Sequence, residues 1–362
     1  MVDSSRKRVA VVGATGVAGQ QFLVALADHP WFEVTSLAAS ERSAGRRYAD
    51  AIRSEAGQLR WSCEEPLPAV FEDRIVESAA DLDLSQLDLV FSAVESDAAR
   101  ALEERFAAER PVVSTASAYR YEDDVPIVVP GVNHEHTALV ERQRKERGWR
   151  GYVVPIPNCT TTGLVMALAP LQHRFGLKSV IVTSMQALSG AGRSPGVQSL
   201  DILDNVIPFI PAEEEKVQRE TAKILGRLTG DRIEALELPV SAHCNRVAVR
   251  DGHTECVSVG LEGPAEPGEV AEAMRAFARE FCDLGLPSAP PELIHVSDDP
   301  YRPQPKLDRA LHGGMTTVVG RIRPDPVLEN GVKLVLLSHN TKLGAAKGAC
   351  LVAEYLVHAG LA

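Results

Sequence analysis

Residues 9–19 are VAVVGATGVAG, an apolar run followed by a glycine-rich turn. The apolar run predicts a short buried strand, and residues 20–26 after the turn predict a helix. Glycines let a backbone turn tightly and approach a pyrophosphate, which then lies at the helix N-terminus. The order strand, turn, helix therefore favours a dinucleotide site over a purely structural turn. The contacts with the nucleotide are expected from Gly13, Thr15, Gly16, Val17 and Ala18.

Strand-like and helix-like segments alternate through about the first 150 residues. Further strands are predicted at 34–38, 87–92, 112–115, 127–129 and 152–156, and a helix at 98–109. This βαβ alternation predicts a parallel sheet with helices on both faces. It is typical of an α/β domain of the Rossmann type.

The remaining residues have many predicted strands with few helices between them. Strands are predicted at 179–187, 233–240, 247–249, 255–261, 316–322 and 333–337, and helices at 213–228 and 270–281. This pattern indicates an α+β domain on a mixed or antiparallel sheet. The alanine-rich segment 344–358 predicts a last helix that packs back onto the first domain. We therefore expect one domain at 1–157 with 341–362, and a second at 158–340.

The composition excludes several classes of protein. The 362 residues suffice for about two domains, and 45% hydrophobic with 24% charged residues is ordinary for a globular protein. The formal net charge of −11 argues against nonspecific nucleic-acid binding. No run approaches the ~18 apolar residues of a membrane span, and no signal-peptide core follows the basic N-terminus, so we expect a cytoplasmic protein. The six cysteines lack zinc-site spacing, which predicts free thiols and no metal centre.

The segment after the second predicted strand bears on the choice of dinucleotide. Enzymes that use NAD usually have an acidic residue there, which binds the ribose 2′-hydroxyl. This chain has Ser40, Arg42 and Ser43, which can bind a 2′-phosphate, so NADP is favoured. Glu41 is the opposing feature, because a carboxylate pointed inward would favour NAD.

Cys159 stands where the predicted strand at 152–156 gives way to a helix. The threonines at 160–162 are of the residue types that commonly begin a helix. A thiol at that place meets unpaired backbone N–H groups and the positive end of the helix dipole, which favour the nucleophilic thiolate. The alternative is a cysteine that only packs, since cysteine is among the most buried residue types.

Three further segments carry residue types suited to catalysis. His253 follows an Asp-Gly turn and can move a proton near neutral pH, although a solvated surface histidine fits the same pattern. Gln186 leads into a glycine-rich loop at 188–192, of the kind that lets a ligand approach closely. Glu213 and Lys216 belong to a charge run, for which a solvated helix face is the usual explanation.

Taken together, these motifs resemble aspartate-semialdehyde dehydrogenase, in particular the fungal and archaeal branch of that family. The matching segments follow the family's order over nearly the whole chain and are 13–19, 117–120, 123–126, 158–161, 186–192, 199–208, 213–216, 244–246, 251–255, 302–305 and 338–341. The resemblance implies a Rossmann-type dinucleotide-binding domain followed by a catalytic and dimerisation domain of the semialdehyde dehydrogenase type. It also implies a homodimer or homotetramer.

The resemblance implies NADPH-dependent reduction of L-aspartyl 4-phosphate to L-aspartate 4-semialdehyde with release of phosphate. This reaction serves lysine, methionine and threonine biosynthesis. Cys159 matches the nucleophile that forms an acyl-thioester, His253 matches the acid/base, and Gln186 matches a residue that orients the intermediate. The resemblance further assigns Arg246 to the substrate carboxylate, Arg120, Asn158 and Lys216 to phosphate, Glu213 to substrate positioning, and Ser189, Gly190 and Asn340 to the nicotinamide end of the cofactor.

Several positions depart from the family's pattern. Thr115 stands where asparagine is common, Ala248 replaces a frequent proline, and Arg193 and Ser194 follow the predicted cofactor loop where an aromatic residue is usual. These departures leave open a reductase of another activated acyl group, such as malonyl-CoA or an N-acylglutamyl phosphate. A binding or regulatory protein that has lost catalysis is the other alternative, and the joint presence of the predicted catalytic residues speaks against it.

Overall fold

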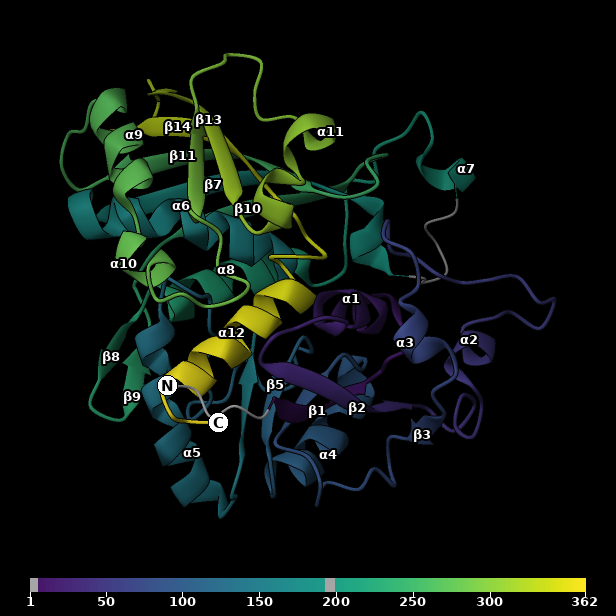
Figure 1. Cartoon of the computed structure of the whole chain (residues 1–362). Coiled ribbons are helices and arrows are strands. Elements are labelled where there is room, and N and C mark those ends of the chain that lie inside the picture. Colours follow the sequence, from purple (N-terminus) through teal and green to yellow (C-terminus); the bar gives the residue numbers. More distant parts are fainter. Residues whose placement is uncertain (1–5, 193–198) are drawn as a thin grey trace. The chain divides into compact units, whose positions relative to one another are not determined.

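The computed structural model describes residues 6–192 and 199–362 (Figure 1). The chain divides into two compact units. The first consists of Met1–Ile127, His136–Ile156 and Ala345–Ala362, and the second of Val128–Glu135 and Pro157–Gly344. The predicted domain ranges differ from this division mainly over residues 128–135.

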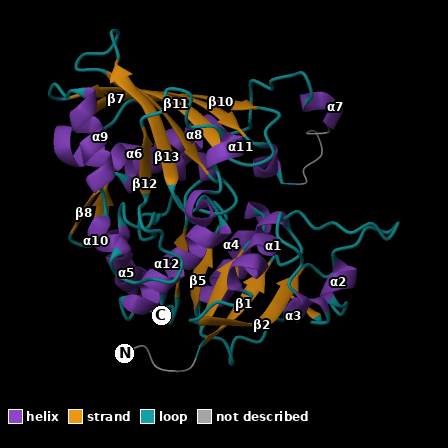
Figure 2. Cartoon of the chain, turned by 45° about the horizontal axis from the view of Figure 1, so that its top comes forward, coloured by secondary structure: helices purple, strands orange, loops and turns teal. Residues whose placement is uncertain are grey.

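The first unit is built on a six-stranded sheet in which every neighbouring pair is parallel (Figure 2). Its strands are β1 (Lys7–Val12), β2 (Phe32–Ala39), β3 (Val76–Ser78), β4 (Leu89–Ser92), β5 (Pro111–Ser114) and β6 (Tyr152–Pro155). Its helices are α1 (Val17–Leu26), α2 (Tyr48–Ala51), α3 (Ala69–Glu72), α4 (Ser96–Ala107), α5 (Leu139–Arg147) and α12 (Ala346–His358), and the short 3₁₀ helix η1 (His134–Ala138) precedes α5. The strand order is β3-β2-β1-β4-β5-β6, which reverses between β1 and β4. Rossmann folds bind dinucleotides at this reversal.

The central strands of this sheet are apolar along their length because both of their faces are covered. Val9 to Val12 of β1 and all of β4 are buried. Parallel sheets enclosed by helices typically have such continuous apolar runs. This explains why the run at 9–12 predicts a buried strand without any alternation of polar residues.

A buried polar contact holds the C-terminal helix within the first unit. Helix α12 packs against α1, and His29 Nε2 lies 2.8 Å from Glu354 Oε1. The other ring nitrogen of His29 accepts hydrogen bonds from the backbone N–H groups of Trp31 and Phe32, each at 3.1 Å. The turn that leads from α1 into β2 is thereby tied to the last helix of the chain.

The second unit is built on a mixed six-stranded sheet, as the sequence pattern predicts. Its order is β10-β7-β11-β14-β13-β12, with parallel pairing between β10 and β7 and between β12 and β13. The strands are β7 (Leu177–Gln186), β10 (Val240–Arg246), β11 (His253–Leu261), β12 (Ile294–Ser297), β13 (Thr317–Pro324) and β14 (Val332–Ser338), and β8 (Arg227–Thr229) and β9 (Arg232–Glu234) form a separate hairpin. The helices are α6 (Cys159–Phe175), α7 (Ser199–Ile202), α8 (Glu213–Ile224), α9 (Pro267–Ala276), α10 (Arg279–Cys282) and α11 (Pro305–Asp308), with 3₁₀ helices η2 (Leu188–Ala191) and η3 (Leu311–Gly314).

Helix α6 is the buried centre of the second unit. It contacts β7, β11, β13 and β14 as well as α8 and α9. Every residue from Thr160 to Leu171 is buried. A helix enclosed in this way is apolar around its whole circumference rather than along one stripe. The N-terminus of α6 is therefore held in a fixed place within this unit.

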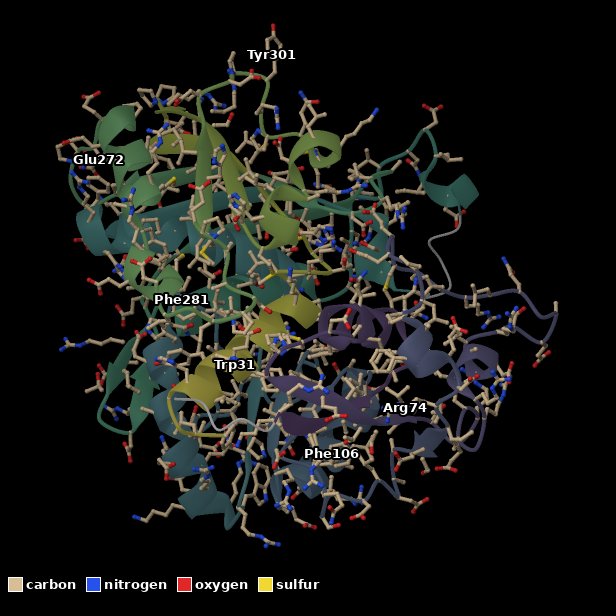
Figure 3. All side chains as sticks on the ribbon, in the orientation of Figure 1. Trp31, Arg74, Phe106, Glu272, Phe281 and Tyr301 are labelled. Atoms are coloured by element: carbon tan, nitrogen blue, oxygen red, sulfur yellow. The ribbon has the colours of Figure 1, made fainter. Side chains whose placement is uncertain are left out.

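Residues 128–135 pack around Phe281 of the second unit, which is labelled in Figure 3. The ring centroids of His134 and Phe281 are 5.1 Å apart. Gly131 has φ +79°, which favours glycine, and a Cβ there would lie 2.2 Å from Leu293 Cδ1. This packing groups the segment with the second unit.

Two predicted strands do not form. At 127–129 the Val129 N–H donates to the Asn133 side chain at 2.8 Å, which makes a turn instead of a strand pairing. At 247–249 the Val249 N–H bonds to the carbonyl of Val247, which again closes a turn. Apolar residues at both places resemble a strand in sequence, but at each place a local hydrogen bond closes the backbone into a turn.

Other predicted elements have different bounds. The predicted strand at 233–240 contains only the end of β9 and the start of β10, and the predicted helix at 213–228 ends at Ile224 before β8. The predicted helix at 270–281 is broken at Phe277, whose backbone is extended with φ −65° and ψ 134°. Strand β10 is absent from the prediction because its buried positions include Cys244 and Arg246 among polar neighbours.

The helices of the described ranges, 6–192 and 199–362, include none that is long and apolar enough to cross a membrane.

Candidate active site

Cys159 and His253 face each other within the second unit. Cys159 is the first residue of α6 and is partly exposed, whereas His253 is the first residue of β11 and is fully buried. The Cys159 Sγ lies 3.2 Å from His253 Nε2. A cysteine in contact with a histidine is the arrangement of a nucleophile with its activating group. The alternative of a solvated surface histidine is wrong.

The backbone of Ala187 holds both His253 and Arg246, the first through its N–H and the second through its carbonyl. The Ala187 N–H donates to His253 Nδ1 at 3.0 Å. The Ala187 carbonyl accepts from Arg246 Nη1 at 2.8 Å. Ala187 itself is fully buried and directly follows β7, so one rigid backbone position orients the imidazole and the guanidinium together.

Burial is the main electrostatic influence at this centre. It lowers the pKa of His253 to about 3, and the neighbouring charges of Arg246 and His339 act in the same direction. His253 is therefore neutral near pH 7. Burial also lowers the pKa of Arg246, but an arginine remains protonated at neutral pH. The site thus holds a neutral imidazole beside a buried positive charge.

Asn158 caps the helix that begins with Cys159. Its side-chain oxygen accepts from the backbone N–H of Thr160 at 2.9 Å and of Thr161 at 3.2 Å. Such caps satisfy backbone donors that the first helical turn leaves unpaired. The cap fixes the position of Cys159 at the positive end of α6.

Two buried carboxylates of α8 hold Asn158 in turn. The Asn158 Nδ2 donates to Glu213 Oε1 at 2.8 Å, and its backbone N–H donates to Glu220 Oε2 at 2.6 Å. Lys216 Nζ lies 3.7 Å from Glu213 Oε2 and remains partly exposed. The charge run at 213–216 is therefore more than a solvated helix face, because Glu213 is only 6% exposed.

Two of the three residues predicted near the nicotinamide, Asn340 and Ser189, are hydrogen-bonded to each other. The Asn340 Nδ2 donates to Ser189 Oγ at 2.8 Å, and its Oδ1 accepts from the Gly252 N–H at 2.8 Å. A Cβ on Gly190 would lie 3.0 Å from Arg246 Nη1 and 3.1 Å from His253 Cε1. The absence of a side chain at Gly190 therefore lets this loop approach the site closely.

Two predicted site residues have contacts that do not by themselves reveal a role. Gln186, the last residue of β7, is buried and its Nε2 donates to Ser184 Oγ at 3.3 Å. Arg120 belongs to the first unit, where it is buried and its Nη2 donates to the Thr115 carbonyl at 2.9 Å. Their assignment to the intermediate and to phosphate stays a prediction.

The glycine-rich turn of the first unit fits a dinucleotide. A Cβ on Gly13 would lie 2.4 Å from the Ala93 carbonyl oxygen, and one on Gly19 would lie 2.1 Å from the Gly13 oxygen. Gly16 is the N-cap of α1 and makes no side-chain hydrogen bond to the backbone N–H groups of the first helical turn. The turn therefore leaves a bare backbone cradle beside β1, at the edge where the strand order reverses.

The residues after β2 agree with a 2′-phosphate more than with a 2′-hydroxyl. Ser40 and Arg42 are exposed at the end of this strand, and Ser43 is buried. Glu41 accepts a hydrogen bond from Ser78 at the end of β3. Because β3 lies on the opposite side of β2 from β1, Glu41 is turned away from the glycine-rich turn.

Sequence reasoning missed Ala187, Glu220 and Glu255. Ala187 acts through its backbone, which no side-chain pattern reveals. Glu220 follows Glu213 by seven residues, and this helical spacing could have placed both on the buried face of α8. Glu255 is fully buried two positions after His253, and burial, followed by the charge of Glu213, raises its pKa well above the ordinary value.

Arg193 and Ser194 lie outside the described residues. Over 6–192 and 199–362, no group of three or more His, Cys, Asp or Glu side chains could hold a metal ion.

The chain is similar to known proteins over nearly its whole length. Residues 8–140 match the family model "Semialdehyde dehydrogenase, NAD binding domain", and residues 168–343 match "Semialdehyde dehydrogenase, dimerisation domain". The chain is 48% identical to the aspartate-semialdehyde dehydrogenase of Archaeoglobus fulgidus, over 97% of this chain and 98% of the relative. The structure resembles aspartate semialdehyde dehydrogenase with NADP from Candida albicans, with a TM-score of 0.87, 40% identity, and coverage of 99% and 100%. It also resembles aspartate semialdehyde dehydrogenase II complexed with ASA from Vibrio cholerae, with a TM-score of 0.76, 25% identity, and coverage of 98% and 99%.

Proposed function

The chain belongs to the aspartate-semialdehyde dehydrogenase family, and on that premise we propose that it reduces L-aspartyl 4-phosphate to L-aspartate 4-semialdehyde with NADPH. The single observation that carries this proposal beyond family membership is the 3.2 Å contact between Cys159 Sγ and His253 Nε2 at the start of α6. A cysteine in contact with a histidine is a nucleophile of the kind that can displace phosphate from an acyl phosphate.

Cys159 is the proposed nucleophile. Its sulfur attacks the acyl carbon, the bond from carbon to the phosphate oxygen breaks, and phosphate leaves with the electron pair. The positive end of the α6 dipole favours the negative sulfur. His253 is the proposed acid/base partner, with Nε2 as the atom that faces the sulfur.

The substrate groups have matched partners. Arg246 is buried and suits the planar carboxylate, because a guanidinium can donate two parallel hydrogen bonds. Lys216 suits phosphate as a point charge, with Arg120 and Asn158 in the same predicted group. Glu213 positions Asn158 and so acts on the substrate indirectly. Gln186 is proposed to orient the thioester.

NADP is the proposed cofactor, and its reduced form, NADPH, would supply the hydride that reduces the thioester. The cradle at Gly13–Gly19 and the Ser40, Arg42 and Ser43 segment support this choice. Ser189, Gly190 and Asn340 are proposed to bound the nicotinamide end, since Asn340 fixes Ser189 and Gly190 lacks a side chain.

A homodimer through the second unit is part of the proposal, as is the predicted cytoplasmic location. The matched dimerisation model covers the mixed sheet. Ile181, Ser241, His243 and Cys256 are exposed at alternate positions of neighbouring strands β7, β10 and β11. Their alternation with buried residues places them on one open face of the sheet, which a second copy of the chain would cover.

The experiment that tests the function runs the reaction backwards, with aspartate semialdehyde and NADP, with and without inorganic phosphate. We expect rapid phosphate-dependent NADP reduction, which is lost in Cys159→Ala and retained in Cys282→Ala, a matched variant at a half-buried thiol. NAD in place of NADP should give a lower kcat/KM. Activity only with coenzyme A in place of phosphate would favour a CoA-thioester reductase, and full activity of Cys159→Ala would refute the mechanism.

A further inference from the structure

The four backbone carbonyl groups of residues 13–16, in the glycine-rich turn, all accept hydrogen bonds from the protein. The first and the last accept backbone N–H groups of the turn and of α1, at 3.0 Å and 2.9 Å. The Ala14 carbonyl accepts from the Tyr48 hydroxyl at 2.9 Å. The Thr15 carbonyl accepts from Gln20 Nε2 at 3.2 Å. Two of the four carbonyls are therefore held by side chains.

The backbone N–H groups of the same turn have a different arrangement. Those of residues 17–19 belong to the first turn of α1 and so have no acceptor within the helix. Because a peptide group is planar and trans, its C=O and N–H point in opposite directions. The bond from Tyr48 to the Ala14 carbonyl therefore also directs the Thr15 N–H away from Tyr48. With its carbonyls occupied and its N–H groups available, the turn is suited to an anion.

Tyr48 reaches the turn from the segment that joins β2 to β3. It is the first residue of α2 and is fully buried. Its backbone N–H donates to the Arg74 carbonyl at 2.7 Å, close to the start of β3. Burial raises the pKa of its phenol, so the hydroxyl stays protonated at neutral pH. The donor to the Ala14 carbonyl thus has an anchored backbone and a constant charge.

Gln20 is also fully buried, and its side-chain amide makes three hydrogen bonds. Besides the Thr15 carbonyl, Nε2 donates to the Arg60 carbonyl at 2.9 Å. The amide oxygen accepts from the Ser62 N–H at 2.7 Å. Because a backbone N–H can bond only to the amide oxygen, the contact with Ser62 fixes which way the amide faces. It therefore directs Nε2 towards the Thr15 carbonyl.

We propose that Tyr48 and Gln20 are positioning residues of the cofactor site. By holding the carbonyl groups of Ala14 and Thr15 inside the protein, they leave only N–H donors for the pyrophosphate of the dinucleotide. This inference rests on the proposed function through its NADP site, and it adds to that site two buried side chains. Without these contacts the peptide groups of the turn can rotate, and a carbonyl oxygen turned outward repels the phosphate oxygens.

Two buried tyrosines of the first unit allow a matched test. Tyr152, on the edge strand β6, also donates its hydroxyl to a backbone carbonyl, that of Leu361 at 3.1 Å. Titration with NADPH, followed by its fluorescence, should give a Kd about fivefold to 30-fold higher in Tyr48→Phe, the effect of one lost buried hydrogen bond. Tyr152→Phe should keep the wild-type Kd. Equal Kd values in the two variants would overturn the role of Tyr48.

A matched pair exists for Gln20 as well. Gln143 is fully buried in α5, and its amide also bonds to two carbonyls, of Asp124 and Val153, and to one backbone N–H. Gln20→Met and Gln143→Met therefore remove equivalent contacts and should lose similar stability in urea unfolding. Only Gln20→Met should bind NADPH more weakly. Equal losses of affinity in both would refute the role of Gln20, and Tyr48→Phe decides the inference if Gln20→Met does not fold.

Adenosine 2′-phosphate separates the turn from the rest of the cofactor site, because this ligand carries no pyrophosphate. In competition with NADPH it should bind the wild type and Tyr48→Phe with the same affinity. An equal loss for both ligands would place the effect outside the turn and overturn the inference.

Kinetics should show a change in cofactor binding and none in the chemical step. In the phosphate-dependent assay, Tyr48→Phe should raise the KM for NADP and leave kcat and the KM for aspartate semialdehyde unchanged. A fall in kcat with an unchanged KM for NADP would contradict the inference. The binding measurements need no turnover, so the expected Kd values in a protein without phosphate-dependent activity would refute only the substrate assignment.

Discussion

At the scale of single residues, His253 makes folding stability depend on pH. Burial lowers its pKa to about 3, well below the ordinary value for histidine. The unfolded chain binds a proton at this residue below about pH 6.5 and the folded chain does not, so stability falls as pH falls from about 6.5 towards 3. His253→Gln should flatten this loss, as measured by urea unfolding at several pH values. The exposed His358→Gln should keep the wild-type slope, and a similar flattening in that variant would count against the assignment.

Activity should be sensitive to even a methyl side chain at position 190, where the chain has Gly190. A Cβ at this position would lie 3.0 Å from Arg246 Nη1 and 3.1 Å from His253 Cε1, closer than ordinary van der Waals contact. Gly190→Ala should therefore displace both groups and lower kcat/KM about 10-fold to 100-fold, since small misplacements of catalytic groups are costly. Gly268→Ala is the matched control, because a Cβ there meets nothing within 4 Å. Equal kcat/KM in the two variants would show that the loop adapts.

Residues with a distinctive side chain could be predicted from the sequence, and residues that act through the backbone could not. Cys159 stands at a strand-to-helix change, and the structure places it at the first position of α6. The environment of His253 was not predictable, since a histidine after an Asp-Gly turn is usually solvated. Ala187 carries no side-chain signal, although its backbone N–H and carbonyl each bind a site residue.

At the scale of elements, Asn158 decides how α6 begins. Asn158→Ala removes the acceptor for two backbone N–H groups and should cost about 1 kcal/mol of unfolding free energy, the usual value for an N-cap. Asn158→Asp keeps the cap oxygen but sets a carboxylate against Glu213, which now receives the amide at 2.8 Å. We expect both variants to lose activity. In urea unfolding, Asn158→Asp should have a lower unfolding free energy at pH 8 than at pH 5, because its carboxylate is set against that of Glu213. A pH-independent difference between them would contradict the role of Glu213.

The bounds of an element could be predicted where its buried residues form a regular apolar pattern in the sequence. They could not be predicted where a hydrogen bond closes the backbone into a turn. The runs at 9–12 and 333–337 are apolar or alternate cleanly, and they lie within β1 and β14. At 247–249 the apolar residues form a turn, because the Val249 N–H bonds back to the Val247 carbonyl, whereas the Val247 N–H bonds to the Gln186 carbonyl at the end of β7. Strand β10 was missed because Arg246 is buried at its end, whereas a charged residue in a sequence normally indicates an exposed position. Buried charges depart from that rule mainly at functional sites.

At the scale of the whole molecule, the alternation of strands and helices in one half and the strand-rich pattern in the other predicted two sheets of different type. The structure contains one fully parallel sheet and one mixed sheet. The grouping of residues 128–135 with the second unit could not be predicted, because it depends on Phe281 and Leu293, which lie about 150 residues later in the chain. Contacts between segments so distant in sequence leave no periodic signal.

The proposed dimer makes a prediction about the open face of the mixed sheet. Ile181 is 43% exposed on β7, where it is paired with Ser241 on one side and Ser258 on the other. An apolar residue at the middle of an open sheet face is typical of an interface core, and a charge there would be buried without a partner in the dimer. Ile181→Lys should therefore shift the protein from dimer towards monomer in sedimentation equilibrium at micromolar concentration. Val327→Lys is the matched control, since Val327 is 84% exposed in a loop of the same unit and should leave the mass unchanged. Dissociation in the control alone, or an unaltered mass in Ile181→Lys, would place the interface elsewhere on the second unit.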